Sequence, residues 1–334
     1  MGIEGVSVKD ENWMDDEWVV FRGYQRHLLQ VCFTDRKLGE LIQHLKAVHL
    51  YDRALIVVTA DHGASFLPGE FFRSISDANY QDILAVPLFL KLPKSTKVAI
   101  IDHSVESVDI LPTVADALGI KLHFQTDGFS ALRDRTKHRS KIRVRKTIFS
   151  NDKEWREFDS EILNSGSLAR KIAVFGTGSP NHILEPTMVP ELLKMRAADP
   201  SFQNNNDVAI ELKNPKSFEN VDLKSGFIPV FIAGRVLFPF TPKGPILLGV
   251  WINDRFCGIT STFPPDLKEK GWLRTLWIQS STGKTQDFKI EDVQGFGIMV
   301  PESSFRQGKN DIQIVNLQNW AEKNAFQPPS FPFP

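Results

Sequence analysis

The sequence is poor in cysteine and has no long apolar run. Its 334 residues include two cysteines, Cys32 and Cys257, which lie in distant segments. Cysteines placed in this way predict core thiols rather than a disulfide framework or a thiolate metal site. No stretch reaches the roughly eighteen apolar residues that a membrane span requires, and residues 1–20 lack the basic start and apolar centre of a signal peptide. We therefore expect neither a membrane span nor a signal peptide.

An excess of charge of one sign is also missing. The chain has 40 Lys and Arg residues against 40 Asp and Glu residues, for a net charge of zero. This balance does not indicate a polyanionic partner, so we expect no nucleic acid. The strongly basic stretch 133–146 has no interleaved aromatic residues, and we interpret it as a solvated linker. The alternative for this stretch is a patch for nucleic acid or anionic lipid.

What the sequence does contain is a run of six uncharged residues, from Ala54 to Thr59, followed closely by Asp61, His62 and Gly63. A short run rich in Val and Ile predicts a strand buried in a parallel sheet. Ligand sites in such sheets form at the carboxyl ends of the strands, which favours a metal site here. We expect Gly63 to provide the conformational freedom for the turn. The alternative is an ordinary turn in which Asp61 caps the next element and His62 is solvated.

The surrounding pattern predicts an α/β layered domain. Apolar residues recur at helical spacing from Trp18 to Leu45, and Gly39 predicts a close contact or a break within that helix. We interpret 64–82 as a loop and 83–93 as a second strand, in which Pro87 favours an edge or a bulge. A turn and a helix are predicted for 103–120, and the whole succession is typical of layered α/β folds.

Four ordered blocks carry a family resemblance: TDRKLGELIQHL, LYDRALIVVTADHG, VPLFLKLP and SVESVDILPTVADALGI. In this order they resemble the C-terminal half of the sulfatase family, within the alkaline-phosphatase-like superfamily. The resemblance covers residues 17–132. The Asp-His form of the metal motif is similar to that of phosphodiesterases, phosphonate hydrolases and phosphoethanolamine or phosphoglycerol transferases. The segment ADHGASFLPGE followed by DILAVPLFLKLP resembles a bacterial group of membrane-embedded sulfatase-like proteins.

The resemblance implies that Asp61 and His62 are ligands of a divalent metal. A carboxylate paired with an imidazole suits Zn or Mn, whereas Ca or Mg favours an all-oxygen site. The substrate implied is an anionic sulfate or phosphate ester, whose oxygens Arg73 and His103 would contact. The alternatives are a solvent-facing arginine in a loop and a histidine at the entry of a helix.

The sequence also departs from the family. Family members carry their nucleophile and further metal ligands before the long helix, but here only a polar arm, residues 1–16, precedes it. Cys32 has no Pro or Arg at the spacing of the family's nucleophile motif. Two protein ligands are fewer than a catalytic metal site normally has. We therefore expect a truncated or split domain, inactive alone or completed by an N-terminal half or membrane domain on another polypeptide. By resemblance, the domain would face the periplasm or the exterior.

Beyond residue 146 the pattern changes to short apolar runs separated by turns. Strands are predicted at 171–176, 226–237, 245–263, 272–281, 296–305 and 310–317, and a short helix at 189–197. Asn253-Asp254 is among the turns predicted in this region. Such spacing favours a β-rich accessory domain over 147–320, built as a sandwich or jelly roll. The Pro- and Phe-rich tail, 321–334, is expected to be extended.

Two functions stay open at this stage. The first is a sulfatase-like, metal-dependent hydrolase of sulfate or phosphate esters, or a phospho-group transferase, of which this chain is a C-terminal part. The second is a non-catalytic binding or assembly protein with a degenerate sulfatase-like domain and a β-sandwich. The two differ in whether Asp61 and His62 converge on one point.

Overall fold

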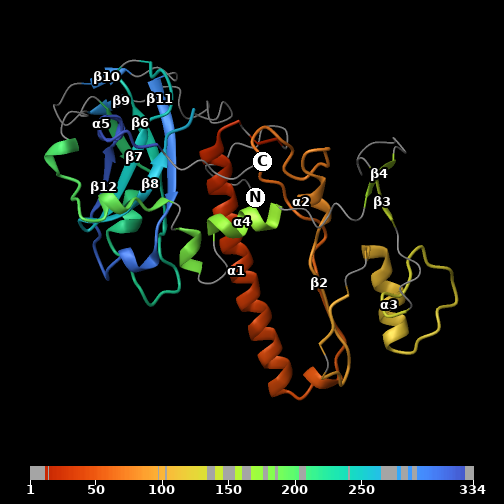
Figure 1. Cartoon of the computed structure of the whole chain (residues 1–334). Coiled ribbons are helices and arrows are strands. Elements are labelled where there is room, and N and C mark those ends of the chain that lie inside the picture. Colours follow the sequence, from red (N-terminus) through yellow and green to blue (C-terminus); the bar gives the residue numbers. More distant parts are fainter. Residues whose placement is uncertain are drawn as a thin grey trace. The chain divides into compact units, whose positions relative to one another are not determined.

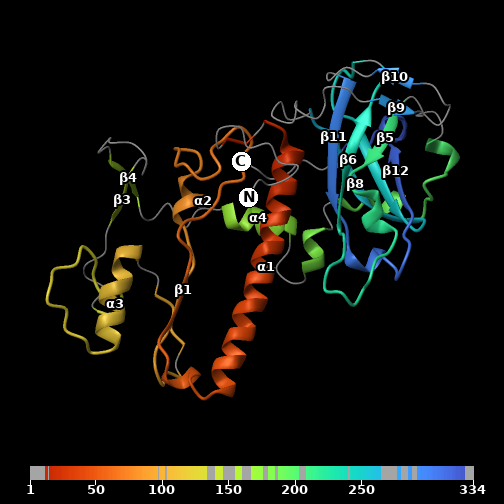
Figure 2. The same cartoon turned by 180° about the vertical axis from the view of Figure 1, so that it is seen from behind.

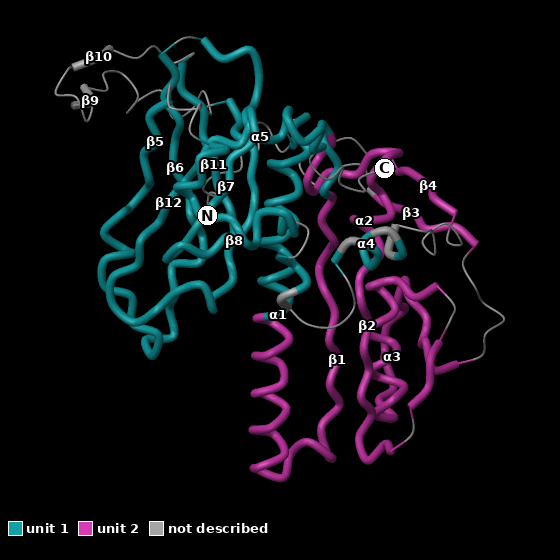
Figure 3. The backbone as a smooth tube through the Cα atoms, turned by 60° about the vertical axis from the view of Figure 1, so that its left-hand side comes forward, with its two compact units in different colours: residues 1–32, 66–69, 167–334 teal, residues 33–65, 70–166 magenta. Residues whose placement is uncertain are grey.

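The computed structural model describes residues 12–13, 15–96, 98–101, 104–133, 140–145, 155–159, 167–175, 180–184, 187–202, 208–239, 241–264, 277–279, 285–287 and 292–327. The chain divides into two compact units (Figure 3). Unit 1 comprises residues 1–32, 66–69 and 167–334, and unit 2 comprises residues 33–65 and 70–166. Within the described parts, helices are mixed with small antiparallel sheets, which is compatible with an α/β fold.

A long helix, α1 (Glu17–Ala47), runs from unit 1 into unit 2. Asp16 begins it, because its Oδ1 accepts a hydrogen bond from the Val19 amide at 3.0 Å. The expected break at Gly39 is absent from α1, which Figure 1 and Figure 2 show as one uninterrupted helix. The predicted close contact is absent too among the described residues, since beyond the adjacent residues and the local helix backbone no atom lies within 4 Å of where a Gly39 Cβ would be.

In the described part of unit 2 there are two two-stranded sheets and two short helices. Strand β1 (Ile56–Thr59) pairs with β2 (Leu88–Lys91), and β3 (Lys141–Arg145) pairs with β4 (Trp155–Asp159), both antiparallel. The prediction of a buried strand in a parallel sheet is therefore wrong. Among the described residues β1 has β2 as its one partner, so Ile56, Val57 and Val58 are half-buried.

Helices of unit 2 flank these strands in sequence. The stretch predicted as a strand from residue 83 instead begins with α2 (Tyr80–Leu84), and β2 starts directly after Pro87. Pro87 lacks an amide hydrogen, which explains why pairing begins only after it. The predicted helix near residue 110 is confirmed as a 3-10 turn, Ser107–Asp109, followed by α3 (Ile110–Ala117).

Unit 1 is dominated by two three-stranded antiparallel sheets. The first has the order β11-β6-β5 and the second the order β12-β7-β8. Strands β7 and β8 form a hairpin through Asn253 and Asp254, whose positive φ angles of 52° and 64° suit the tight turn that the sequence predicted. A further pair, β9 and β10, is also antiparallel. The bounds are β5 (Ala209–Leu212), β6 (Phe231–Leu237), β7 (Leu247–Ile252), β8 (Arg255–Ser261), β9 (Trp277–Gln279), β10 (Thr285–Asp287), β11 (Val293–Met299) and β12 (Ile312–Asn316).

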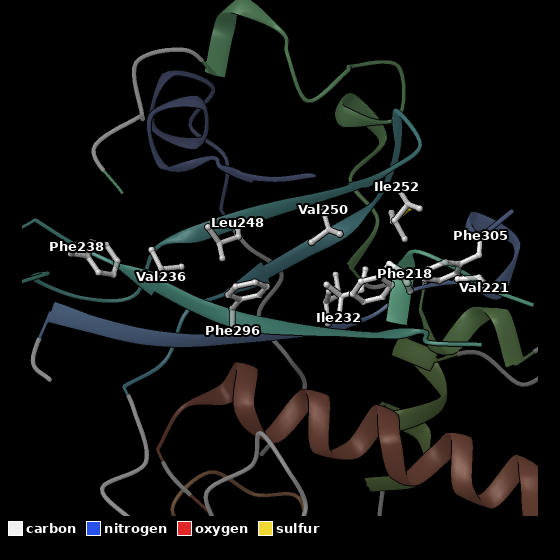
Figure 4. Packing of buried hydrophobic residues seen from close by; sticks show 13 residues of the cluster. Phe218, Val221, Ile232, Val236, Phe238, Leu248, Val250, Ile252, Phe296 and Phe305 are labelled. Atoms are coloured by element: carbon white, nitrogen blue, oxygen red, sulfur yellow. The ribbon is translucent and has the colours of Figure 1, made fainter. Parts of the chain in front are cut away.

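Both three-stranded sheets contribute to one apolar core. Figure 4 shows side chains of β6 and β11 facing those of β7, and the core members are Phe218, Val221, Ile232, Val236, Phe238, Leu248, Val250, Ile252, Cys257, Phe296, Ile298, Val300 and Phe305. Cys257 is buried there, as predicted, and Cys32 on α1 is half-buried. A second cluster around Trp251 includes Trp320 of the short helix α5 (Gln318–Lys323).

Two local predictions in unit 1 are wrong. Residues 171–176 were expected to form a strand, but residues 171–175 belong to α4 (Ser167–Phe175), and residue 176 lies outside the described residues. The apolar positions 168, 172 and 175 follow a helical rather than an alternating spacing. The expected helix at 189–197 is reduced to a 3-10 turn at Pro190–Leu192. Across the described residues, no helix combines the length and apolar character that crossing a membrane would require.

Candidate metal centre

The candidate centre follows the end of β1, in unit 2. Gly63 fixes the path of the chain there, because its amide donates a hydrogen bond to the Ile83 carbonyl at 2.8 Å. A Cβ on residue 63 would lie 1.9 Å from the Asp82 carbonyl oxygen, so no other residue fits. Gly63 has no left-handed φ angle. The glycine thus permits a close approach of two backbones rather than the unusual turn that we expected.

Asp61 and His62 come together at this strand end. The His62 amide donates to Asp61 Oδ1 at 2.9 Å, and His62 Nε2 lies 3.7 Å from Asp61 Oδ2. The Asp61 side chain is 87% exposed and that of His62 is 38% exposed. The chain has therefore left the regular strand, in which neighbouring side chains would point to opposite faces. A carboxylate oxygen and a ring nitrogen are both open to solvent and close to each other.

The His62 ring is oriented by its own backbone. Its Nδ1 lies 2.6 Å from the Gly63 carbonyl oxygen, which can only accept a hydrogen bond. This contact places the proton of the neutral ring on Nδ1 and leaves the Nε2 lone pair available. Metal-binding histidines are commonly oriented by such a contact from the second ring nitrogen.

Electrostatics keep the Asp61 carboxylate ionised. The hydrogen bond from the His62 amide, followed by attraction from the His62 ring and a smaller contribution from Arg73, lowers the pKa of Asp61 from its usual value. A deprotonated carboxylate beside an imidazole with a free nitrogen forms a donor pair suited to a divalent cation. Over the described ranges, no group of three or more His, Cys, Asp or Glu residues is arranged to hold a metal. The residues present therefore fit part of a metal site.

Of the other two predicted site residues, the structure describes Arg73 but not His103. Arg73 is exposed, with its guanidinium 5.4 Å from the Phe72 ring, and its charge acts on Asp61. His103 lies outside the described residues. Sequence reasoning missed Asn79, a buried residue of the loop that carries Arg73. An Asn directly before a short helix was the one available signal, and it suggested only a cap.

The motif Asp109-x-x-Pro112-Thr113 has a structural role in unit 2. Asp109 accepts hydrogen bonds from the Glu106 amide at 2.9 Å and the Phe129 amide at 2.7 Å. Thr113 Oγ1 donates to the Asp109 carbonyl and accepts from the Ala131 amide. The motif thus fastens the segment after α3 to the start of that helix.

Comparison with known proteins finds similarity in the N-terminal third of the chain. Residues 7–120 match the sulfatase family. Arylsulfatase K of Rattus norvegicus is 31% identical over 99 residues, which are 30% of this chain and 17% of that protein. A sulfatase of Formosa agariphila is 27% identical over 135 residues, 39% of this chain and 26% of that protein.

Human arylsulfatase K gives a similar result, with 31% identity over 99 residues, 30% of this chain and 18% of the relative. The matches thus span between about a sixth and a quarter of these curated relatives. Residues 7–120 of this chain are thus similar to the sulfatase family. The family implies the alkaline-phosphatase-like fold for this part.

Proposed function

We propose that this chain carries part of the active site of a sulfatase-like hydrolase that uses a divalent metal to cleave sulfate or phosphate esters. The observation that supports it most is the 3.7 Å separation of His62 Nε2 and Asp61 Oδ2, both open to solvent. These two residues would hold the cation, which would supply Lewis-acid stabilisation of charge on the ester. Arg73, the cation of the adjoining loop, would bind the oxygens of the sulfate or phosphate group.

We also propose that the metal site is incomplete within this chain. A catalytic cation in proteins normally has three or more protein ligands, and the described residues bring two together. We propose that the remaining ligands and the nucleophile come from further polypeptide, such as an N-terminal half or a membrane domain, on the extracytoplasmic side. Exposed apolar side chains of unit 2, including Phe33 at 58% and Phe89 at 65%, support such a covering partner.

The β-rich part of unit 1 fits an accessory role in this scheme. We propose that its two three-stranded sheets form a β-sandwich, since both contribute to the core around Leu248 and Phe296. Its described residues hold no group of three potential metal ligands. We therefore place the hydrolytic chemistry in unit 2 and assign assembly or binding to the β-rich part.

Metal binding tests the proposal directly. Isothermal titration of the full chain with Zn, Mn, Ca and Mg is expected to give one site that is weakened at least tenfold in both Asp61→Ala and His62→Gln. Asp52→Ala, which changes an exposed carboxylate of the same unit, is the matched control and should keep the wild-type affinity. Unchanged affinity in Asp61→Ala would remove Asp61 as a ligand and favour the non-catalytic alternative.

Hydrolysis assays test incompleteness separately. The chain alone, loaded with metal, is expected to hydrolyse neither p-nitrophenyl sulfate nor bis-p-nitrophenyl phosphate above background. Turnover that depends on Asp61 would show that the site is complete within this chain.

A further inference from the structure

Asn79 directly precedes α2, but its side chain does not cap that helix. The usual role of Asn at this position is to accept a hydrogen bond from an amide of the first helical turn. Here the side-chain amide turns back into the preceding loop. Its Nδ2 donates to the Phe71 carbonyl at 2.8 Å and the Ser74 carbonyl at 2.9 Å, and its Oδ1 accepts from the Ser76 amide at 2.7 Å.

These contacts leave one possible orientation of the Asn79 amide. The two carbonyls need a donor and the Ser76 amide needs an acceptor, so exchanging Oδ1 and Nδ2 would break all three bonds. The Asn79 residue is 1% exposed. Water cannot replace these bonds easily at such a site, and buried polar groups left without partners are costly. Asn79 therefore holds its loop in one conformation.

The residues that Asn79 holds lie on both sides of Arg73. Phe71 precedes Arg73 by two positions, and Ser74 follows it directly. The Phe72 carbonyl accepts a hydrogen bond from the Ser65 amide at 3.0 Å, which joins this loop to the segment that follows His62. Glu70 Oε2 and Ser76 Oγ, 2.7 Å apart, close the loop from outside. The backbone of Arg73 is thus fixed while its side chain stays exposed.

Arg73 is the single basic residue between His62 and Asn79. It directly follows Phe72, whose carbonyl accepts the hydrogen bond from the amide of Ser65, three positions after His62. A guanidinium presents several donors in a planar fork that matches the oxygens of sulfate or phosphate. A long side chain binds such a group best when its backbone is held still, because less freedom is lost on binding.

We propose that Asn79 is the positioning residue for anion recognition, holding the loop 70–76 so that Arg73 presents its guanidinium to a sulfate or phosphate group beside Asp61 and His62. The inference rests on the proposed function, because it concerns the anionic group of the same substrate. It adds a residue that touches neither metal nor substrate and acts through Arg73.

Inorganic sulfate is the probe for this proposal. The full chain, labelled with ¹⁵N-arginine, is titrated with sulfate while the Nε–Hε signal of Arg73, assigned from Arg73→Gln, is followed by NMR. Asn79→Ala is expected to weaken sulfate binding at this signal roughly tenfold, as for other displaced binding groups. Asn79→Ser, which replaces the side-chain amide with a hydroxyl, serves if the Ala variant does not fold. Adding Asn79→Ala to Arg73→Gln should cause no further loss of affinity, as measured by calorimetry.

Two controls separate positioning from general damage. Asn310→Ala removes a similarly buried asparagine, which holds the loop around Arg306 in unit 1, and should leave sulfate affinity unchanged. The Zn affinity of Asn79→Ala should equal that of the wild type. A merely structural defect would instead lower the affinity for Zn as well as the affinity for sulfate. The inference would be overturned if the Arg73 signal did not shift when sulfate is added. It would also be overturned if both Asn79 variants bound sulfate with the same affinity as the wild type. Loss of Zn binding in Asp61→Ala alongside either result would leave the proposed function standing.

Discussion

Arg22 of α1 donates a hydrogen bond from Nη1 to the Gly297 carbonyl of β11 at 2.9 Å, across 275 positions of sequence. The same Nη1 lies 3.2 Å from Thr260 Oγ1, and the guanidinium stands 4.6 Å from the centre of the Phe263 ring. Arg22 is 4% exposed. Within unit 1, the start of the sulfatase-like helix is therefore part of the same folded body as the β-rich strands.

Replacement of Arg22 separates its packing from its charge. Arg22→Ala should lower the free energy of unfolding by about 2–4 kcal/mol, because the buried aliphatic stem leaves a cavity. Arg22→Met should cost much less, since Met fills the volume and removes a charge that is costly to bury. Gly297 keeps a hydrogen bond from Thr260 Oγ1 at 2.8 Å in both variants. Chemical denaturation measures the difference, and equal losses in the two variants would contradict this account.

Burial also predicts how the Arg22 contribution depends on pH. Desolvation lowers the pKa of Arg22 to about 10, well below its usual value, despite the opposing charge of Asp16. A lowered pKa in the folded state means that the protonated group opposes folding below about pH 10. This cost is relieved as the pH rises through the range above about 10. Wild type should therefore gain stability relative to Arg22→Met across that window, as measured by denaturation of both proteins at each pH.

Gly63 and Gly39 differ in the space that an added Cβ would have. Gly63→Ala would place a Cβ 1.9 Å from the Asp82 carbonyl, and should destabilise the chain by about 1–3 kcal/mol. Gly39→Ala, in the interior of α1 with open space around it, should stabilise the chain by about 0.5–1 kcal/mol. Thermal unfolding checks both changes. Destabilisation by Gly39→Ala would mean that the position makes a contact in solution.

The sequence predicted elements whose signals are local. The periodicity of α1 and the Asn253-Asp254 turn each lie within a few residues, and both elements formed as expected. The direction of pairing between β1 and β2 depends on which strands are neighbours in space, which apolar content does not encode. A run of Ile and Val looked like a fully buried strand, yet β1 has one partner strand among the described residues.

The candidate site, like the fold, could be predicted only in part from the sequence. Asp61 and His62 could be located from the strand end that precedes them, although their role as metal ligands stays a prediction. The role of Gly63 was wrong, because the close approach of Asp82 comes from a segment about twenty residues later. Asn79 was missed for the same reason: its three partners lie in an irregular loop without any periodic signal.

The hydroxyl of Thr113 should contribute measurably to the stability of unit 2. It donates to the Asp109 carbonyl at 2.6 Å and accepts from the Ala131 amide at 2.9 Å. Thr113→Val keeps the shape but removes both of these side-chain hydrogen bonds, at a cost of about 1–3 kcal/mol. Thr59→Val, at an exposed position of β1, is the control and should change stability by less than about 0.5 kcal/mol. Faster amide exchange at Ala131 in the Thr113 variant alone would locate the effect.

The exposed apolar side chains of unit 2 make a prediction about the isolated chain. Phe89 on β2 is 65% exposed, and among the described residues β2 has β1 as its one partner strand. A strand edge of this kind favours association with another polypeptide. The dye ANS should therefore bind the native chain, and Phe89→Ser should reduce that fluorescence while changing the free energy of unfolding by less than about 0.5 kcal/mol.

A control with a buried position distinguishes surface exposure from partial unfolding. Ile83→Ser, at a position that is 3% exposed in α2, should increase ANS fluorescence, because it loosens packing and buries a hydroxyl. Opposite responses of the two serine variants would assign the dye signal to an exposed face of folded unit 2. Equal fluorescence in Phe89→Ser and the wild type would mean that Phe89 is covered within the chain, and would remove it from the surface proposed for a partner.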